Sequence, residues 1–208
     1  MLNVYSQREM WRDTSSVAMY SSAYQQLAST DLYLSNSANS LNTAMTSYFS
    51  AFETANANPN TSTGRQGLMS QVSSLVTRFQ TVSATLNDQQ RTINGSIDSE
   101  VKDINSLLTG INDLNQQIIK APKNSDGTTL NLIDQRDEMI RKLSEKMDIR
   151  TVAQSNGSML VNMSTGHSLI LDGGVAQFKV IAGDPDSRDQ ELQLTLGDNQ
   201  ATIDHDTF

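Results

Sequence analysis

The chain has 208 residues, of which 37% are hydrophobic and 18% charged, and it contains no cysteine. This composition supports a folded core, and the absence of cysteine excludes disulfides and thiolate metal sites. No apolar run is long enough to cross a membrane, and the first residues lack the apolar stretch of a secretory signal. We therefore expect a soluble protein, or one that is exported without a cleaved signal peptide.

The net charge is −8, which argues against a nucleic-acid backbone as the partner. The charge is also unevenly distributed along the chain. Residues 1–121 carry seven basic and nine acidic side chains, whereas residues 151–208 carry two basic and eight acidic side chains. Two regions of different character are indicated.

The N-terminal region predicts two helices, over about residues 4–34 and 41–57. The run from Ser35 to Ser40 separates them with turn and capping residues, and Asn58-Pro59 ends the second helix. The apolar positions of the two patterns include Trp11, Val17, Tyr20, Tyr24, Leu27 and Leu34, then Leu41, Met45, Tyr48, Phe49 and Phe52.

Residues 66–121 predict one long helix, because they contain no proline and their apolar residues recur at spacings of mostly three and four. These residues are Leu68, Val72, Leu75, Phe79, Val82, Leu86, Ile93, Ile97, Val101, Ile104, Leu108, Ile111, Leu114 and Ile118. Such a helix would span roughly 84 Å, about twice the ~43 Å diameter of a compact globule of this chain length. We therefore expect an elongated antiparallel helical hairpin or bundle, a rod in which the first two helices cover the third.

A further helix is predicted over 131–149, with Asn131 as its N-cap and Asp134 in its first turn. Two pairs of opposite charge stand at i,i+4 spacing in this pattern: Asp137 with Arg141, and Glu138 with Lys142.

From Arg150 the pattern changes to short strands. Asn156-Gly157 between two such strands predicts a β-hairpin with a type I′ turn. Four to six strands are expected in a small antiparallel sheet, and the chain stops just after the last of them. The fold class is thus α+β, with a helical rod domain at 1–149 and a β domain, predicted to be truncated, at 150–208.

No catalytic, cofactor-binding or metal site stands out. His167 and His205 are the two histidines, and neither has a metal-ligand spacing or a neighbouring nucleophile. Gly173-Gly174 does not open a helix, so it is read as a turn rather than as a phosphate-binding loop. The chain is accordingly predicted not to be an enzyme and to need no cofactor.

One acidic loop leaves a calcium site open as an alternative. Asp184, Asp186, Asp189 and Glu191 are close enough in sequence to attract calcium, although they lack the spacing of an EF-hand. We interpret them as a solvated turn beside Pro185.

The long helix has an unusual polar surface. Between Gln66 and Ala121 only nine residues are charged, and Ser, Thr, Asn and Gln dominate the remaining polar positions. Burying an amide or hydroxyl that finds a partner costs less than burying an unpaired charge. This surface is therefore suited to being covered by neighbouring subunits, with compositional drift as the alternative explanation.

Several motifs in order along the chain resemble one family. They are the segments 40–52, 58–59, 65–71 and 111–118, followed by Leu-Ile-Asp-Gln-Arg-Asp at 132–137. In order and spacing they are similar to the flagellar hook-associated protein of the FlgK type over roughly residues 5–165. The resemblance implies that Asp134-Gln135-Arg136-Asp137 is a structural corner and not a catalytic dyad. Its carboxylates are accounted for by helix capping and by pairing with Arg141.

The resemblance also implies the function and the surroundings of the protein. It implies an extracellular structural part of the bacterial flagellum at the junction of hook and filament, exported unfolded and assembled into a ring. Its partners would be other axial proteins, namely the hook protein and the second junction protein, with no nucleic acid and no membrane. In the family a C-terminal helix covers part of the rod, so the apolar stripe is expected to be exposed here. The alternatives are a related axial protein, such as the second junction protein or a flagellin, and a secreted coiled-coil adhesin.

Overall fold

We analysed a computed structural model of the protein. It describes residues 40–121 and 127–203, together with positions 17, 20, 21, 24, 25, 27, 28, 31 and 32. Each of these single positions is helical, in agreement with the helix predicted over 4–34. Trp11 and Leu34, which also belong to that prediction, lie outside the described residues.

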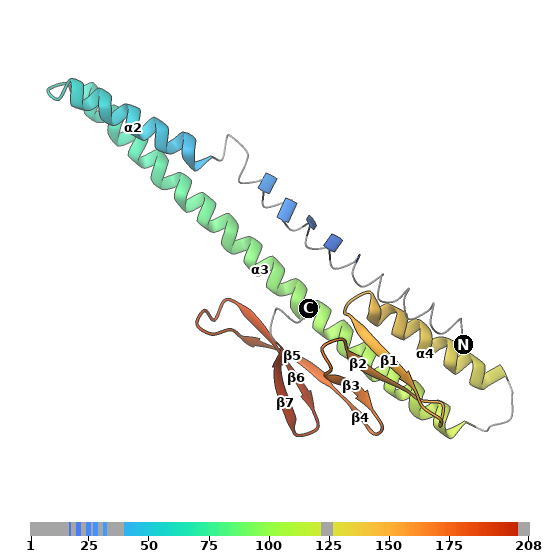
Figure 1. The fold of residues 1–208 in the computed structure, drawn as a ribbon. Coiled ribbons are helices and arrows are strands. Elements are labelled where there is room, and N and C mark those ends of the chain that lie inside the picture. Colours follow the sequence, from blue (N-terminus) through green and yellow to red (C-terminus); the bar gives the residue numbers. More distant parts are fainter. Residues whose placement is uncertain are drawn as a thin grey trace. The chain divides into compact units, whose positions relative to one another are not determined.

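Two helices follow, joined by a tight turn (Figure 1). Helix α2 is Leu41–Ala57, as predicted, and the Ser40 side chain caps it by accepting a hydrogen bond from the Thr43 amide at 3.4 Å. Helix α3 is Ser62–Lys120, four residues longer at its start than the pattern indicated. Its 59 residues correspond to about 88 Å, so the prediction of one long helix is confirmed.

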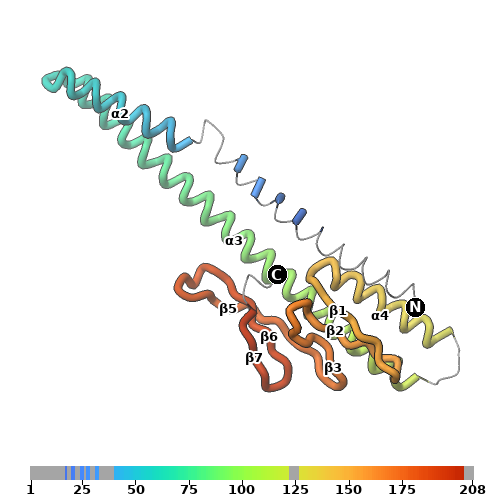
Figure 2. The backbone as a smooth tube through the Cα atoms, viewed as in Figure 1, coloured from blue at the N-terminus to red at the C-terminus, as the bar shows by residue number. Residues whose placement is uncertain are grey.

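The turn between α2 and α3 is held by local hydrogen bonds. Thr61 donates to the Asn58 carbonyl through both its amide, at 3.1 Å, and its hydroxyl, at 2.9 Å. Arg65 donates to the Pro59 carbonyl at 2.7 Å. Gly64 leaves room for this turn, because a Cβ at position 64 would lie 3.0 Å from the Thr61 hydroxyl oxygen, closer than most Cβ contacts. The two helices run antiparallel, as the tube in Figure 2 shows.

Helix α4 is Gly127–Ser144, so the predicted bounds 131–149 are wrong at both ends. Asn131 lies inside the helix, where its side-chain oxygen accepts a hydrogen bond from Gln135 at 3.0 Å, and it is not an N-cap. Asp134 is likewise not in the first turn. The apolar pattern continues past the end of α4. Met147 lies in the turn between α4 and the first strand, and its side chain is buried there, at 4% exposed.

In the described residues, seven strands form two antiparallel sheets rather than the single sheet expected. Strands β1 (Ile149–Ala153), β2 (Met159–Met163), β3 (Ser168–Leu171) and β4 (Gly174–Val175) form one sheet in that order, and β5 (Gln177–Ala182), β6 (Gln190–Leu196) and β7 (Asn199–Ile203) form the other. The chain passes from one sheet to the other at Ala176, which is fully buried and still donates to the Leu169 carbonyl at 2.8 Å. The run 175–182, whose composition alone would suggest one strand, is therefore divided between the two sheets.

The turn between β1 and β2 is also not of the predicted type. A type I′ turn needs positive φ at both central residues, and of the described residues only glycines have positive φ. Here Gly157 has φ 93° and donates to the Gln154 carbonyl at 3.1 Å. Asn156 instead uses its side-chain oxygen to accept from the Ser158 amide and hydroxyl, at 3.0 and 2.7 Å. The hairpin therefore has a longer loop that is held by a side chain.

Packing divides the chain into two units, and the boundary falls inside α3 between Ile93 and Asn94. In the unit that contains residues 94–208, one core joins α3, α4 and both sheets. Its largest fully buried apolar side chains are Leu108, Ile111, Ile140, Leu143, Val161, Leu169 and Ile170. The α+β fold class is confirmed, whereas the boundary proposed between residues 149 and 150 remains a prediction.

Candidate functional site: a helix–hairpin corner and an uncharged helical face

Two asparagines of α3 hold the sheets to the helix. Asn115 donates to the Met159 carbonyl at 2.8 Å and accepts from the Met159 amide at 3.0 Å. Asn105 makes the same pair of bonds with Phe178, at 2.8 Å in both directions. Each side-chain amide thus takes the place that the backbone of a neighbouring strand would occupy.

These bonds are made where each strand lacks a neighbour in its sheet. Strand β5 is at the edge of its sheet, so Phe178 has an outward-facing N–H and C=O. Strand β3 pairs with β2 only from Val161 onward, which leaves Met159 beyond that ladder. Unpaired edges invite pairing with other chains, and natural proteins cover them. Asn105 and Asn115 therefore close two open edges.

A third asparagine extends the set along α3. Asn94 donates to the Arg188 carbonyl in the β5–β6 loop at 2.8 Å. The spacings of 11 and 10 residues between Asn94, Asn105 and Asn115 are close to three helical turns, so all three lie on one side of α3. Sequence reasoning missed them individually, although their recurrence beside the apolar stripe was a usable signal. Part of the uncharged polar surface thus binds this chain's own β strands and not a neighbouring subunit.

We expect Asn115→Ala to lower the free energy of unfolding by about 2 kcal/mol, because it leaves the Met159 N–H and C=O without partners at a buried position. Asn115→Asp should also destabilise, since a carboxylate accepts from the amide but cannot donate to the carbonyl. Urea unfolding followed by circular dichroism measures both changes.

The matched control for this prediction is Asn42→Ala on an exposed position of α2, for which the expected change is within about 0.5 kcal/mol. If Asn42→Ala and Asn115→Ala cost the same, the bonds to Met159 would not contribute as inferred.

The Leu-Ile-Asp-Gln-Arg-Asp motif forms the corner between α4 and the first hairpin. Arg136 is only 4% exposed, and it donates to the Gly157 carbonyl in the hairpin turn at 2.8 Å. Its Nε and Nη2 groups donate to one carboxylate oxygen of Asp137, at 3.2 and 3.0 Å. A buried guanidinium with its fork occupied is a positioning group, and here it fixes the turn against the helix.

The predicted pair of Asp137 with Arg141 is not formed. Asp137 is taken by the buried Arg136, and Arg141 pairs instead with Glu138 at 2.8 Å and with Glu145. The hydrogen bond from Arg141 holds the pKa of Glu138 below its usual value. The predicted pair of Glu138 with Lys142 is present at 4.0 Å. Of the two arginines that could bind Asp137, the buried Arg136 does so. A buried guanidinium needs a carboxylate partner more than an exposed guanidinium does.

The acidic loop between β5 and β6 is organised by an arginine. Arg188 donates to both carboxylate oxygens of Asp186, at 2.6 to 3.1 Å. Gly183 and Asp189 close the loop through a backbone bond of 2.7 Å. Within the described part of the chain, no three acidic or histidine side chains come together as a metal site. His167 lies 3.2 Å from the Thr165 hydroxyl, and His205 is outside the described residues.

The Arg188 hydrogen bonds lower the pKa of Asp186 from 3.8 to about 2. The interaction therefore stabilises the folded state fully above about pH 4 and is lost as the pH falls through about 2. NMR titration of the Asp186 carboxyl should show this low pKa. Arg188→Ala should raise the pKa only part of the way to its ordinary value, because the backbone amide of residue 188 still donates to Asp186 at 3.0 Å. An unchanged pKa in the variant would contradict the pairing.

The unit of residues 23–93 carries a different kind of surface, an exposed apolar row on two helices. On α3 the row comprises Met69, Val76, Phe79 and Leu86, and on α2 it comprises Met45, Phe49 and Phe52. Phe79 and Leu86 belong to the predicted stripe but are 50% and 41% exposed. Val82, three residues after Phe79 and four before Leu86 on the same side of α3, is only 8% exposed, so the stripe is covered in part.

Four hydroxyl side chains on the same stretch of α3 have their donors bound within the helix. Ser73, Thr77, Thr81 and Thr85 each donate their hydroxyl to the carbonyl four residues earlier, at 2.9 to 3.0 Å. Such back-bonding satisfies a hydroxyl within its own helix. These hydroxyls can therefore be covered by a neighbour without leaving their donors unpaired.

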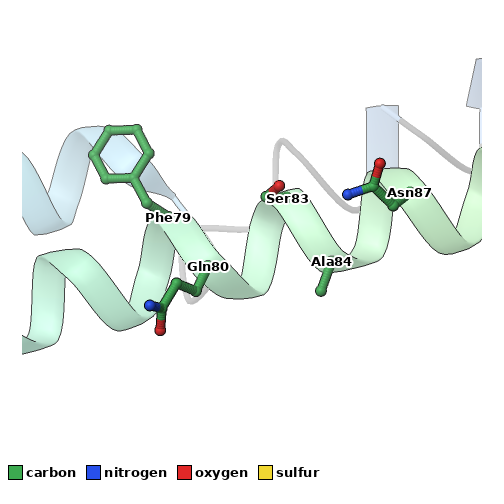
Figure 3. Close-up of a pocket in the computed structure, with 5 residues that line it drawn as sticks. All are labelled: Phe79, Gln80, Ser83, Ala84 and Asn87. Atoms are coloured by element: carbon green, nitrogen blue, oxygen red, sulfur yellow. The ribbon is translucent and has the colours of Figure 1, made fainter.

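An open depression lies on the same helix. Gln80, Ser83, Ala84 and Asn87 line it together with Phe79 (Figure 3). The first four stand at i, i+3, i+4 and i+7, the set of positions that forms a hole for a knob from a facing helix. None of the helices in the described parts of the chain is long and apolar enough to cross a membrane.

Comparisons with known proteins agree with this architecture. The family model described as the flagellar hook-associated protein FlgK helical domain matches residues 27–208. Flagellar hook-associated protein 1 of Escherichia coli K12 is 30% identical over 164 residues, which are 78% of this chain and 30% of that protein. The protein of the same name from Bacillus subtilis 168 is 29% identical over 127 residues, which are 61% of this chain and 25% of that protein.

A solved structure shows the same fold. The flagellar hook junction protein FlgK from Burkholderia pseudomallei superimposes with a TM-score of 0.83 at 24% identity, over 95% of this chain and 36% of that chain. The chain thus spans about a third of the length of the relatives that it matches. The family model covers most of the present sequence, and the chain therefore belongs to the FlgK family of flagellar hook-associated proteins.

Proposed function

We propose that this chain is part of a structural component of the bacterial flagellum, at the junction of hook and filament, and that it works by packing its helices against unlike axial neighbours. The observation that carries the proposal is the uncharged, apolar face on α2 and α3 in a chain of this family. The partners proposed are the hook protein, the second junction protein and further copies of the full-length protein in a ring. The role is mechanical and not enzymatic.

The chemistry of the face supports contact with another helix. Charged residues on α2 and the first half of α3 are few, namely Glu53, Arg65, Arg78, Asp88 and Arg91. Arg91 pairs with Asp88 at 3.2 Å, and Arg65 is bound to the turn before α3. Exposed Phe49, Phe52 and Phe79 supply the large apolar contacts that interfaces favour.

The location is part of the same proposal. A junction part lies outside the cell, and export without a cleaved signal peptide is included in the proposal. The adhesin alternative relied on the acidic loop, whose Asp186 is bound by Arg188. No contact in the described residues favours that alternative.

The test is complementation of a motile strain that lacks its junction protein, using the full-length parent protein. Phe79→Asp should place a charge in the packed face, so we expect filaments to be shed and motility to be lost, while Phe79→Leu should retain both. Leu130→Asp, at an apolar position of α4 that is 61% exposed, is the matched control and should retain filaments. Normal filament attachment in Phe79→Asp, with the protein present at the junction, would overturn the proposed packing face.

A further inference from the structure

The tripeptide Asn-Gly-Ser occurs twice in the chain, at 94–96 and at 156–158, in two different backbone settings. The first copy lies within α3, and the second forms the loop between β1 and β2. Because the covalent chemistry of the two copies is the same, any difference in their reactivity must come from the fold. The pair therefore provides an internal comparison.

We propose that Asn156 is a site of spontaneous deamidation and isoaspartate formation, and that Asn94 is protected from the same reaction. In this reaction the Gly157 amide nitrogen loses its proton to hydroxide and attacks the Asn156 side-chain carbon. The new N–C bond closes a succinimide ring, and the side-chain nitrogen leaves as ammonia. Water then opens the ring to give aspartate or isoaspartate, so no oxidant or reductant is needed.

The loop around Asn156 favours the attack, once the exposed Gly157 amide is released from its 3.1 Å hydrogen bond to the Gln154 carbonyl. The negative charge of the tetrahedral intermediate develops on the Asn156 side-chain oxygen, which already accepts from the Ser158 amide at 3.0 Å and from the Ser158 hydroxyl at 2.7 Å. Two donors aimed at a developing oxyanion are the arrangement that lowers the barrier of acyl-transfer reactions. Asn156 and Gly157 are both exposed, and glycine has no side chain to hinder ring closure.

The setting of Asn94 opposes the same reaction. Asn94 and Gly95 lie in the interior of α3, where ring closure would require the helical backbone to open locally. The side-chain nitrogen of Asn94, which would have to leave, donates to the Arg188 carbonyl at 2.8 Å. The fold thus holds the leaving group in place at Asn94, whereas at Asn156 it holds the oxygen that gains charge.

The modification would act on the corner described above. Isoaspartate places the side-chain methylene in the main chain, next to the Gly157 carbonyl that Arg136 binds. The hairpin would then lose its fixed position against α4. Accumulated isoaspartate at Asn156 should therefore be accompanied by loss of the hydrogen bond from Arg136.

The experiment is incubation of the purified folded chain at mildly alkaline pH, followed by proteolysis and mass spectrometry of the two Asn-Gly-Ser peptides. The Asn156 peptide should gain the mass difference between a carboxyl and a carboxamide about tenfold faster than the Asn94 peptide, since local opening of a helix limits the latter. In denaturant the two rates should converge, because only the fold distinguishes the sites.

Variants at Ser158 separate the oxyanion effect from simple exposure. Ser158→Ala should slow modification of Asn156 about tenfold, whereas Ser158→Thr should keep the rate because it keeps the hydroxyl. Unfolding curves of both variants establish that they are folded. Equal rates at Asn94 and Asn156 in the folded protein, or an unchanged Asn156 rate in folded Ser158→Ala, would overturn the proposal.

Discussion

Leu108→Ala is expected to lower the free energy of unfolding by about 3 to 4 kcal/mol, because it leaves a cavity in a core that cannot collapse freely. Leu108 is fully buried on α3 and belongs to the cluster that joins α3 to α4 and to both sheets. Its loss should weaken every element of that unit at once. Urea unfolding monitored by far-ultraviolet circular dichroism gives the value.

The control for Leu108 is the same substitution at an exposed leucine. Leu130 on α4 is 61% exposed, so Leu130→Ala should change the free energy of unfolding by no more than about 0.5 kcal/mol. Equal losses for the two variants would mean that the core is not organised around α3.

Arg136→Ala is expected to cost about 3 kcal/mol, through broken hydrogen bonds and not through a cavity. The substitution leaves the Gly157 carbonyl and the Asp137 carboxylate without the guanidinium that binds both. Arg136→Lys should recover part of the loss, because an ammonium keeps the charge but cannot make the forked contact. Chemical denaturation measures the stability, and amide hydrogen exchange at the β1–β2 turn reports whether the turn is released.

A second arginine on the same helix provides the control for Arg136. Arg141 pairs with Glu138 and Glu145 on the surface, where water competes for both groups. Arg141→Ala should therefore cost far less than Arg136→Ala, although Arg141 pairs with two carboxylates and Arg136 with one. A larger loss at Arg141 would mean that the number of ion pairs, and not their burial, determines the stability of this helix.

The spacing of the apolar residues was enough to predict the long helix. A stripe with helical period over 56 residues without proline fits hardly any other secondary structure. The same stripe did not distinguish Val82, which is buried, from Phe79, which is exposed. Both fit a helical spacing, and only the placement of the neighbouring helices decides which of them is covered.

The corner illustrates a second limit. The motif at 132–137 identified the place, but the partners of its charges depend on contacts distant in sequence. Arg136 occupies a core position four residues after Leu132 and four before Ile140, and that spacing was the available signal for its burial. The bond to Gly157 could not be predicted, because it depends on where the hairpin turn lies.

The short strands show a third limit, which arises where the chain changes direction within a run of strand-forming residues. Nothing in the local sequence around Ala176 marks a break, yet the two sheets meet there. Which sheet a strand joins is set by pairing with distant residues, such as Phe178 with Leu194, and not by local propensity.

The back-bonded hydroxyls on α3 have a consequence for how a contact with this stretch of the helix would respond to dissolved salt. Ser73, Thr77, Thr81 and Thr85 carry no charge, and their hydrogens are already bound within the helix. An association made by such a surface has almost no ionic component for dissolved salt to screen. Its strength should therefore stay nearly constant between fresh and saline water, whereas a contact built on Lys–Glu pairs would weaken.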